Sequence, residues 1–111
     1  MDFEISEQLL DPIGVRLLLS GELDLAAVKP LSDRLRSLAK PGAIVVLDMS
    51  RVGFVDSTGI GVLVRFFKSS RRKGWQLRIE PGITSQVQKV LELSGIDHVF
   101  WPERPGSTAD R

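Results

Sequence analysis

The chain has 111 residues, of which 42% are hydrophobic and 26% charged, and its formal net charge is +1. This length and composition are typical of one soluble globular domain, and the near-neutral charge excludes bulk attraction to nucleic acid or to an anionic membrane. There is no cysteine for disulfides or thiolate chemistry, no apolar run near the ~20 residues of a membrane span, and no secretory signal, so we expect a cytoplasmic protein without membrane insertion.

The N-terminal segment predicts a β-hairpin. Val15, Leu17 and Leu19 alternate with residues of the opposite face, which is typical of a strand with one apolar face. Phe3 to Leu9 is a weaker strand candidate, and Asp11-Pro12 supplies the turn between the two.

A first helix is predicted after Gly21-Glu22-Leu23-Asp24, where the apolar spacing changes to three and four. Its apolar face consists of Val28, Leu31, Leu35 and Leu38. Asp24 is the expected N-cap, and Pro30 is tolerated only near the first turn, where a missing N–H has no partner within the helix. Lys40-Pro41-Gly42 then ends the helix.

The remainder of the chain alternates strands and helices. Ala43 to Asp48 is a continuous apolar run ending in a carboxylate, as in a central strand buried on both faces. After a short connection, the apolar spacing predicts a second helix from Ser57 to Lys73, with cations in its last turn and Gly74 after it. A strand over Trp75 to Glu80 and a third helix over Thr84 to Ser94 follow.

The complete predicted order is ββαβαβαβ, with a short last strand over Asp97 to Trp101. This order indicates an α/β domain over residues 1–101, with a mixed, largely parallel sheet and three helices packed mainly on one side. Residues 102–111 have little apolar surface to bury, so we expect a disordered C-terminal tail.

The most informative stretch is Val55-Asp56-Ser57-Thr58-Gly59-Ile60-Gly61, which lies between a buried strand and a helix. In open α/β sheets, function is often located at such strand ends. We expect the Ser57 hydroxyl to cap the helix, and the glycines to leave a bare surface that the backbone of a partner can approach. A simpler interpretation stays open, in which Asp56, Ser57 and Thr58 are only cap chemistry and the glycines only packing.

A hydroxyl at an exposed helix N-terminus is also a suitable phosphorylation site. A phosphate on Ser57 is expected to meet unpaired backbone N–H groups and the positive end of the helix dipole. The fold would then tolerate the modification, while the charge of the outward surface changes by about −1.5 to −2.

The segment Val52 to Lys73, with its DSTGIGVL core, resembles the signature of STAS domains, named for sulfate transporters and anti-sigma factor antagonists. It is most similar to the bacterial anti-anti-sigma factors of sporulation and general stress control. Gly21 to Asp24 resembles the loop before the first helix of that family, and Val87 to Gly95 resembles its third helix. The similarity spans Phe3 to Phe100 in matching element order, so the resemblance implies the STAS fold.

The resemblance also implies a function. Ser57 would be phosphorylated by a partner that is both an anti-sigma factor and a serine kinase of the GHKL type. The unphosphorylated chain would bind this partner and release a sigma factor, and a phosphatase acting on phospho-Ser57 would restore it. The implied partner surface comprises Asp24, Asp56, Ser57, Thr58, Gly59, Ile60 and Gly61. Thr58 replaces the second serine of many relatives and is the second choice for the phosphorylated hydroxyl, and Ile60 replaces a frequent leucine.

Other functions are weighed against this one. A STAS accessory subunit of a lipid-transport ABC complex and a stressosome-type scaffold are the alternatives. Enzymatic activity is not expected, because Gly59-x-Gly61 lacks the rest of a nucleotide-binding fingerprint. His98, the only histidine, is interpreted as a structural residue. Acid–base pairing of Asp48 with Asp56, or of Glu22 with Asp24, is less favoured than loop and cap polarity. We therefore expect no cofactor, no metal and no direct binding to nucleic acid.

Overall fold

The computed structural model describes residues 2–10 and 14–95, and its centre is a four-stranded sheet in the order β1-β2-β3-β4. The strands are β1 (Glu4–Leu10), β2 (Gly14–Leu23), β3 (Ile44–Val55) and β4 (Gln76–Ile79). β1 pairs with β2 antiparallel, whereas the pairs β2–β3 and β3–β4 are parallel, which confirms the mixed, largely parallel sheet.

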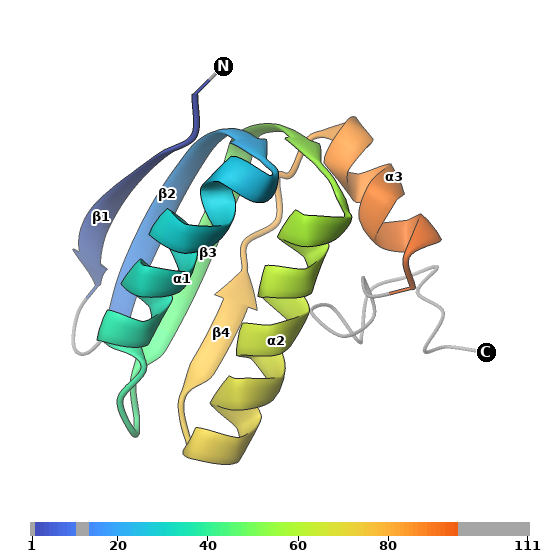
Figure 1. The fold of residues 1–111 in the computed structure, drawn as a ribbon. Coiled ribbons are helices and arrows are strands. Elements are labelled where there is room, and N and C mark those ends of the chain that lie inside the picture. The colour runs from blue at the N-terminus through green and yellow to red at the C-terminus, as the bar shows by residue number, and fades with distance from the viewer. Residues whose placement is uncertain (1, 11–13, 96–111) are drawn as a thin grey trace.

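Three helices connect and follow these strands: α1 (Leu25–Leu38), α2 (Ser57–Lys73) and α3 (Ser85–Leu93). Figure 1 shows α1 and α2 side by side across one face of the sheet, with α3 beside the end of β3. The Thr84 hydroxyl, at the N-cap of α3, donates to the carbonyl oxygen of Val52 in β3 at 3.3 Å. The predicted strand at 97–101 and tail at 102–111 lie outside the described residues, so the domain boundary at residue 101 stays a prediction.

Helix ends follow the signals in the sequence. The Asp24 carboxylate caps α1 by accepting from the Ala26 N–H at 3.1 Å, as predicted. At the C-terminus of α2, Gly74 adopts a left-handed conformation with φ 78° and donates to the carbonyl oxygen of Ser70. A residue with a side chain would be strained there, so Gly74 sets the length of α2.

The core lies between the helices and the sheet. Its members are apolar side chains that face inward from every element except β1, together with Trp75 beside β4: Leu17, Leu19, Leu23, Ala27, Leu31, Leu35, Val45, Leu47, Met49, Val52, Val55, Val62, Leu63, Phe66, Trp75, Leu77, Ile79, Val87 and Leu91. This one cluster fixes α1 and α2 against β2 and β3 and thereby positions their N-termini.

β3 is longer than the sequence predicts. The strand continues past Asp48 to Val55, where a short connection was expected. Register shifts between β2 and β3 insert extra residues into β3, and beyond Met49 its buried residues recur every third position, at Val52 and Val55. Bulges of this kind bend a strand and break its alternation, which is why the prediction ended too early.

The sheet face away from the helices is crossed by a polar bridge. Arg16 in β2 binds both carboxylate oxygens of Glu80, just after β4, at 2.9 and 2.8 Å and so spans β3. The same guanidinium donates to Gln8 in β1 at 3.0 Å. Two parallel N–H···O bonds fix geometry as well as charge, so this bridge ties β1 and β2 to the segment that follows β4.

Candidate functional site

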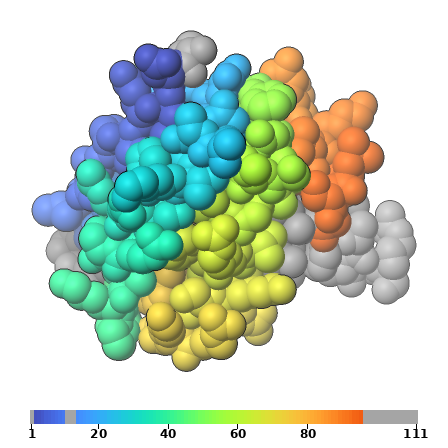
Figure 2. All heavy atoms as spheres, viewed as in Figure 1, coloured from blue at the N-terminus to red at the C-terminus, as the bar shows by residue number. Residues whose placement is uncertain are grey.

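Two helix N-termini lie next to each other at one end of the sheet. Leu23 and Val55 are register partners at the ends of β2 and β3. Each is followed by an aspartate that caps the next helix, Asp24 for α1 and Asp56 for α2. Figure 2 shows the first turns of α1 and α2 adjoining at the surface of this end of the molecule. The fold therefore brings the predicted Asp24 loop and the DSTG segment together.

Asp56, and not Ser57, caps α2, so the prediction of a Ser57 cap is wrong. One carboxylate oxygen of Asp56 accepts from the backbone N–H groups of Thr58 and Gly59, at 2.9 and 3.0 Å. The same oxygen accepts the hydroxyl hydrogen of Thr58. This Thr58 hydrogen bond, followed by that from the Gly59 amide, holds the pKa of Asp56 below its usual value, so Asp56 is a carboxylate at neutral pH.

The two candidate hydroxyls differ in environment. Thr58 is half-buried and its hydroxyl is occupied by Asp56. Ser57 is the first residue of α2, its side chain is exposed, and its hydroxyl has no hydrogen-bond partner among the described residues. Of the two hydroxyls, that of Ser57 is therefore free and accessible to a modifying enzyme, and that of Thr58 is not.

The amides at the mouth of α2 are largely in use. The Asp56 carboxylate holds those of Thr58 and Gly59, and the Asp56 carbonyl oxygen holds that of Ile60 at 3.0 Å. The expectation that a phosphate on Ser57 meets unpaired N–H groups is therefore wrong for these three amides.

The last three residues of the segment 55–61 face either the protein interior or open space. Gly59 is buried: a Cβ there would lie 2.3 Å from the carbonyl oxygen of Leu23, so β2 occupies the space that a side chain would need. Ile60 is half-buried and packs against the core. Only Gly61 leaves open space, since nothing lies within 4 Å of its Cβ position. Gly59 thus serves packing, and Gly61 alone fits the expected bare surface.

Two exposed apolar residues at this end were missed by the sequence analysis. Leu25, the first residue of α1, is 72% exposed, and Phe54, near the end of β3, is 48% exposed. Leu25 lies outside the apolar helix face of Val28, Leu31 and Leu35, and this position could have predicted its exposure from the sequence. The exposure of Phe54 could not be predicted in this way, because the predicted strand ended at Asp48.

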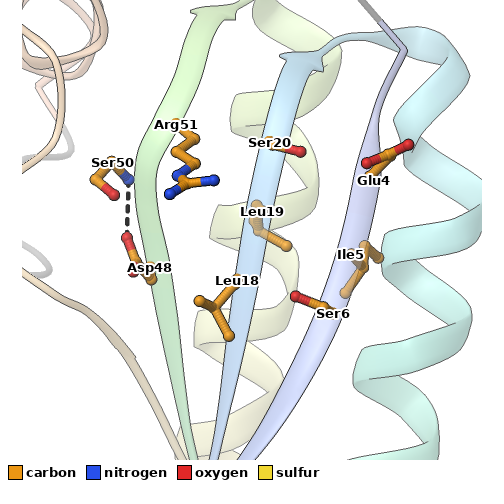
Figure 3. A pocket seen from close by; sticks show the side chains of 9 residues that line it. All are labelled: Glu4, Ile5, Ser6, Leu18, Leu19, Ser20, Asp48, Ser50 and Arg51. Atoms are coloured by element: carbon orange, nitrogen blue, oxygen red, sulfur yellow. Dashed lines mark hydrogen bonds between the residues drawn. The ribbon is translucent and has the colours of Figure 1, made fainter.

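A separate hollow lies on the sheet face away from the helices, where β3 bulges (Figure 3). It has a volume of about 610 Å³, and Glu4, Asp48 and Arg51 are its charged lining residues. Asp48 accepts from the Ser50 backbone N–H at 3.0 Å, which lowers its pKa. Because Asp48 lies along β3 and Asp56 caps the helix beyond it, the two do not form an acid–base pair.

Within residues 2–10 and 14–95, no three His, Cys, Asp or Glu side chains gather so that they could hold a metal ion. Across the same residues, every helix is too short or too polar to cross a bilayer.

Comparison with known proteins identifies the family. The STAS domain family model matches residues 7–108, and the chain therefore belongs to the STAS domain family. The chain is 27% identical over 86 residues to the anti-sigma-B factor antagonist of Bacillus subtilis, covering 78% of each chain. It is 28% identical over 101 residues to that of Listeria monocytogenes, covering 90% of this chain and 86% of the relative.

A solved structure with the same fold is that of an anti-sigma factor antagonist from Mycobacterium paratuberculosis. It superposes with a TM-score of 0.72 at 20% identity, over 89% of this chain and 83% of that one. At this level of identity the likeness concerns the fold, and it confirms the STAS-like arrangement of sheet and helices predicted from the sequence.

Proposed function

We propose that this protein is an anti-sigma factor antagonist that acts by binding rather than by catalysis, and that phosphorylation of Ser57 switches this binding off. The observation that carries the proposal is the exposed, unengaged Ser57 hydroxyl at the first position of α2, in a chain of the STAS family. The names of its curated relatives support the antagonist role.

The proposed cycle takes place in the cytoplasm and has two states. The unphosphorylated protein binds an anti-sigma factor that is also a GHKL-type serine kinase, and the sigma factor is released. Phosphorylation of Ser57 by this kinase ends the complex, and a phosphatase acting on phospho-Ser57 restores binding. The partner surface comprises the two helix mouths, with Asp24, Asp56 and Gly61 beside Ser57.

The local chemistry supports an electrostatic switch. Phosphorylation adds about −1.5 to −2 charge units beside Asp56, whose carboxylate is already ionised. Since Asp56 holds the amides of Thr58 and Gly59, these two groups offer the phosphate little compensation. A partner that covers Ser57 would have to desolvate this group, and an imperfectly paired buried charge costs several kcal/mol.

Phosphosite mapping tests the proposal. The protein is incubated with ATP and each candidate anti-sigma factor kinase of its source genome, and the products are mapped by mass spectrometry. We expect one phosphate on Ser57, unchanged labelling of Thr58→Val, and no labelling of Ser57→Ala. Labelling of Ser57→Ala at Thr58 would contradict the assignment, and absence of both binding and labelling with every kinase would contradict the function.

A further inference from the structure

We infer that Leu25 and Phe54 are the apolar anchors through which the unphosphorylated protein holds the partner that covers Ser57. This inference rests on the proposed function and extends it, since it names the side chains that supply affinity. They are two of only four large apolar residues that are strongly exposed in the described part of the chain.

The sheet register places Leu25 in a position equivalent to that of Ser57. Leu23 and Val55 are partners at the strand ends, and the residue after each strand is an aspartate cap. Leu25 and Ser57 are then the first residues of adjacent helices. Packed helices are about 8–10 Å apart, so a partner seated on Ser57 has to extend only that distance to reach Leu25.

Phe54 borders the same strand end from β3. Its register partner is Glu22, and it lies three residues before Ser57 in the chain. A stable interface covers about 800 Å² on each partner, which is far more than the Ser57 turn alone offers. A partner bound at Ser57 is therefore expected to cover the ends of both β2 and β3, and with them Leu25 and Phe54.

The polar groups at this end are poorly suited to carry the affinity. Asp56 is engaged in capping α2 and Asp24 in capping α1, and Thr58 is held by Asp56. Leu25 and Phe54, in contrast, expose apolar surface to water. Burying this surface against a partner is favourable and would stabilise the complex. Interfaces commonly concentrate their affinity in a few side chains that become fully buried near the centre of the contact.

The other two exposed apolar residues provide matched controls. Leu9 lies in β1 and Leu93 at the end of α3, and each is 81% exposed, which is at least as much as either proposed anchor. If exposed apolar area acted without regard to place, all four residues would contribute equally. The inference predicts that only the pair beside Ser57 does.

Titration calorimetry tests the inference with the anti-sigma factor kinase that phosphorylates the wild-type protein. We expect Leu25→Ala and Phe54→Ala each to weaken Kd by about tenfold or more, and Leu9→Ala and Leu93→Ala to change it less than about twofold. Wild-type affinity in either anchor variant, or an equal loss in the controls, would overturn the inference. A kinase that phosphorylates Ser57 but forms no measurable complex with the wild type would also overturn it.

Two further variants separate affinity from folding. Leu25→Glu places a carboxylate in the first turn of α1, where the helix dipole favours it, so the fold should be kept while binding weakens at least as much as in Leu25→Ala. Phe54→Thr introduces a β-branched residue, which is favourable in a strand, and replaces Phe54→Ala if that protein unfolds. Folded proteins with wild-type Kd would contradict the anchor role. If no kinase binds or labels the wild type, the proposed function itself fails, which is a distinct result.

Discussion

The carbonyl oxygen of Leu23 accepts the backbone N–H of Asp56 at 3.3 Å, and the same oxygen lies 2.3 Å from the position that a Cβ of residue 59 would occupy. The end of β2 therefore supports the first turn of α2 directly. This contact keeps Ser57 at a fixed place beside α1, so a chemical change at Ser57 acts on a preformed surface.

Gly59→Ala and Gly61→Ala should have opposite effects on stability. The new methyl group at residue 59 would collide with backbone that cannot yield, so we expect destabilisation of about 1–3 kcal/mol. At residue 61 the space is open, and the higher helix propensity of alanine should stabilise by up to about 1 kcal/mol. Urea unfolding followed by circular dichroism measures both. A stabilising Gly59→Ala would contradict the close packing of α2 on Leu23.

Gly61→Ala also tests the bare surface. If the backbone of a partner approaches Gly61, the variant should bind the anti-sigma factor kinase more weakly even though it is more stable. Calorimetric titration beside the wild type provides the comparison. Unchanged affinity would limit the role of Gly61 to local helix structure.

Ser57→Ala should leave stability within about 0.5 kcal/mol of the wild type, because the side chain is exposed and does not cap the helix. Asp56→Ala should be the most destabilising of the cap substitutions, ahead of Asp24→Ala, since Asp56 accepts three hydrogen bonds and Asp24 one. Thermal unfolding gives the ranking. A loss for Ser57→Ala as large as that for Asp56→Ala would restore Ser57 as the cap.

The Asp56 carboxylate should make stability depend on acid. Its pKa in the folded protein is lowered, chiefly by the Thr58 hydroxyl, so its contribution is complete above about pH 4 and is lost as pH falls through the lowered pKa. The stability difference between wild type and Asp56→Asn should therefore shrink on acidification. Asp33 and Asp48 also have lowered pKa values, but both proteins share them and they cancel. A difference independent of pH would contradict the hydrogen-bond pattern.

Much of the fold follows from apolar spacing. The faces of α1 and α2, the Asp24 cap and the left-handed Gly74 follow rules that act within a few residues. The end of β3 does not follow such local rules, because its bulges depend on pairing with β2. Its buried residues recur every third position, and this spacing is not the alternation that identifies a strand in a sequence.

The site was predicted as a segment but not residue by residue. Asp56 and Ser57 are both good caps, and the choice depends on where the backbone turns into the helix. The inward position of Gly59 depends on Leu23, which is distant in sequence and adjacent only through the parallel register. Long-range contacts of this kind leave no local pattern.

The most direct test of the central claim compares the affinities of the unphosphorylated and Ser57-phosphorylated proteins for the anti-sigma factor kinase by titration calorimetry. Because each ~1.4 kcal/mol changes affinity tenfold, and a poorly paired buried charge costs several kcal/mol, we predict a loss of about a hundredfold or more. Ser57→Asp should reproduce only part of this loss. Equal affinities of the two forms would contradict the switch.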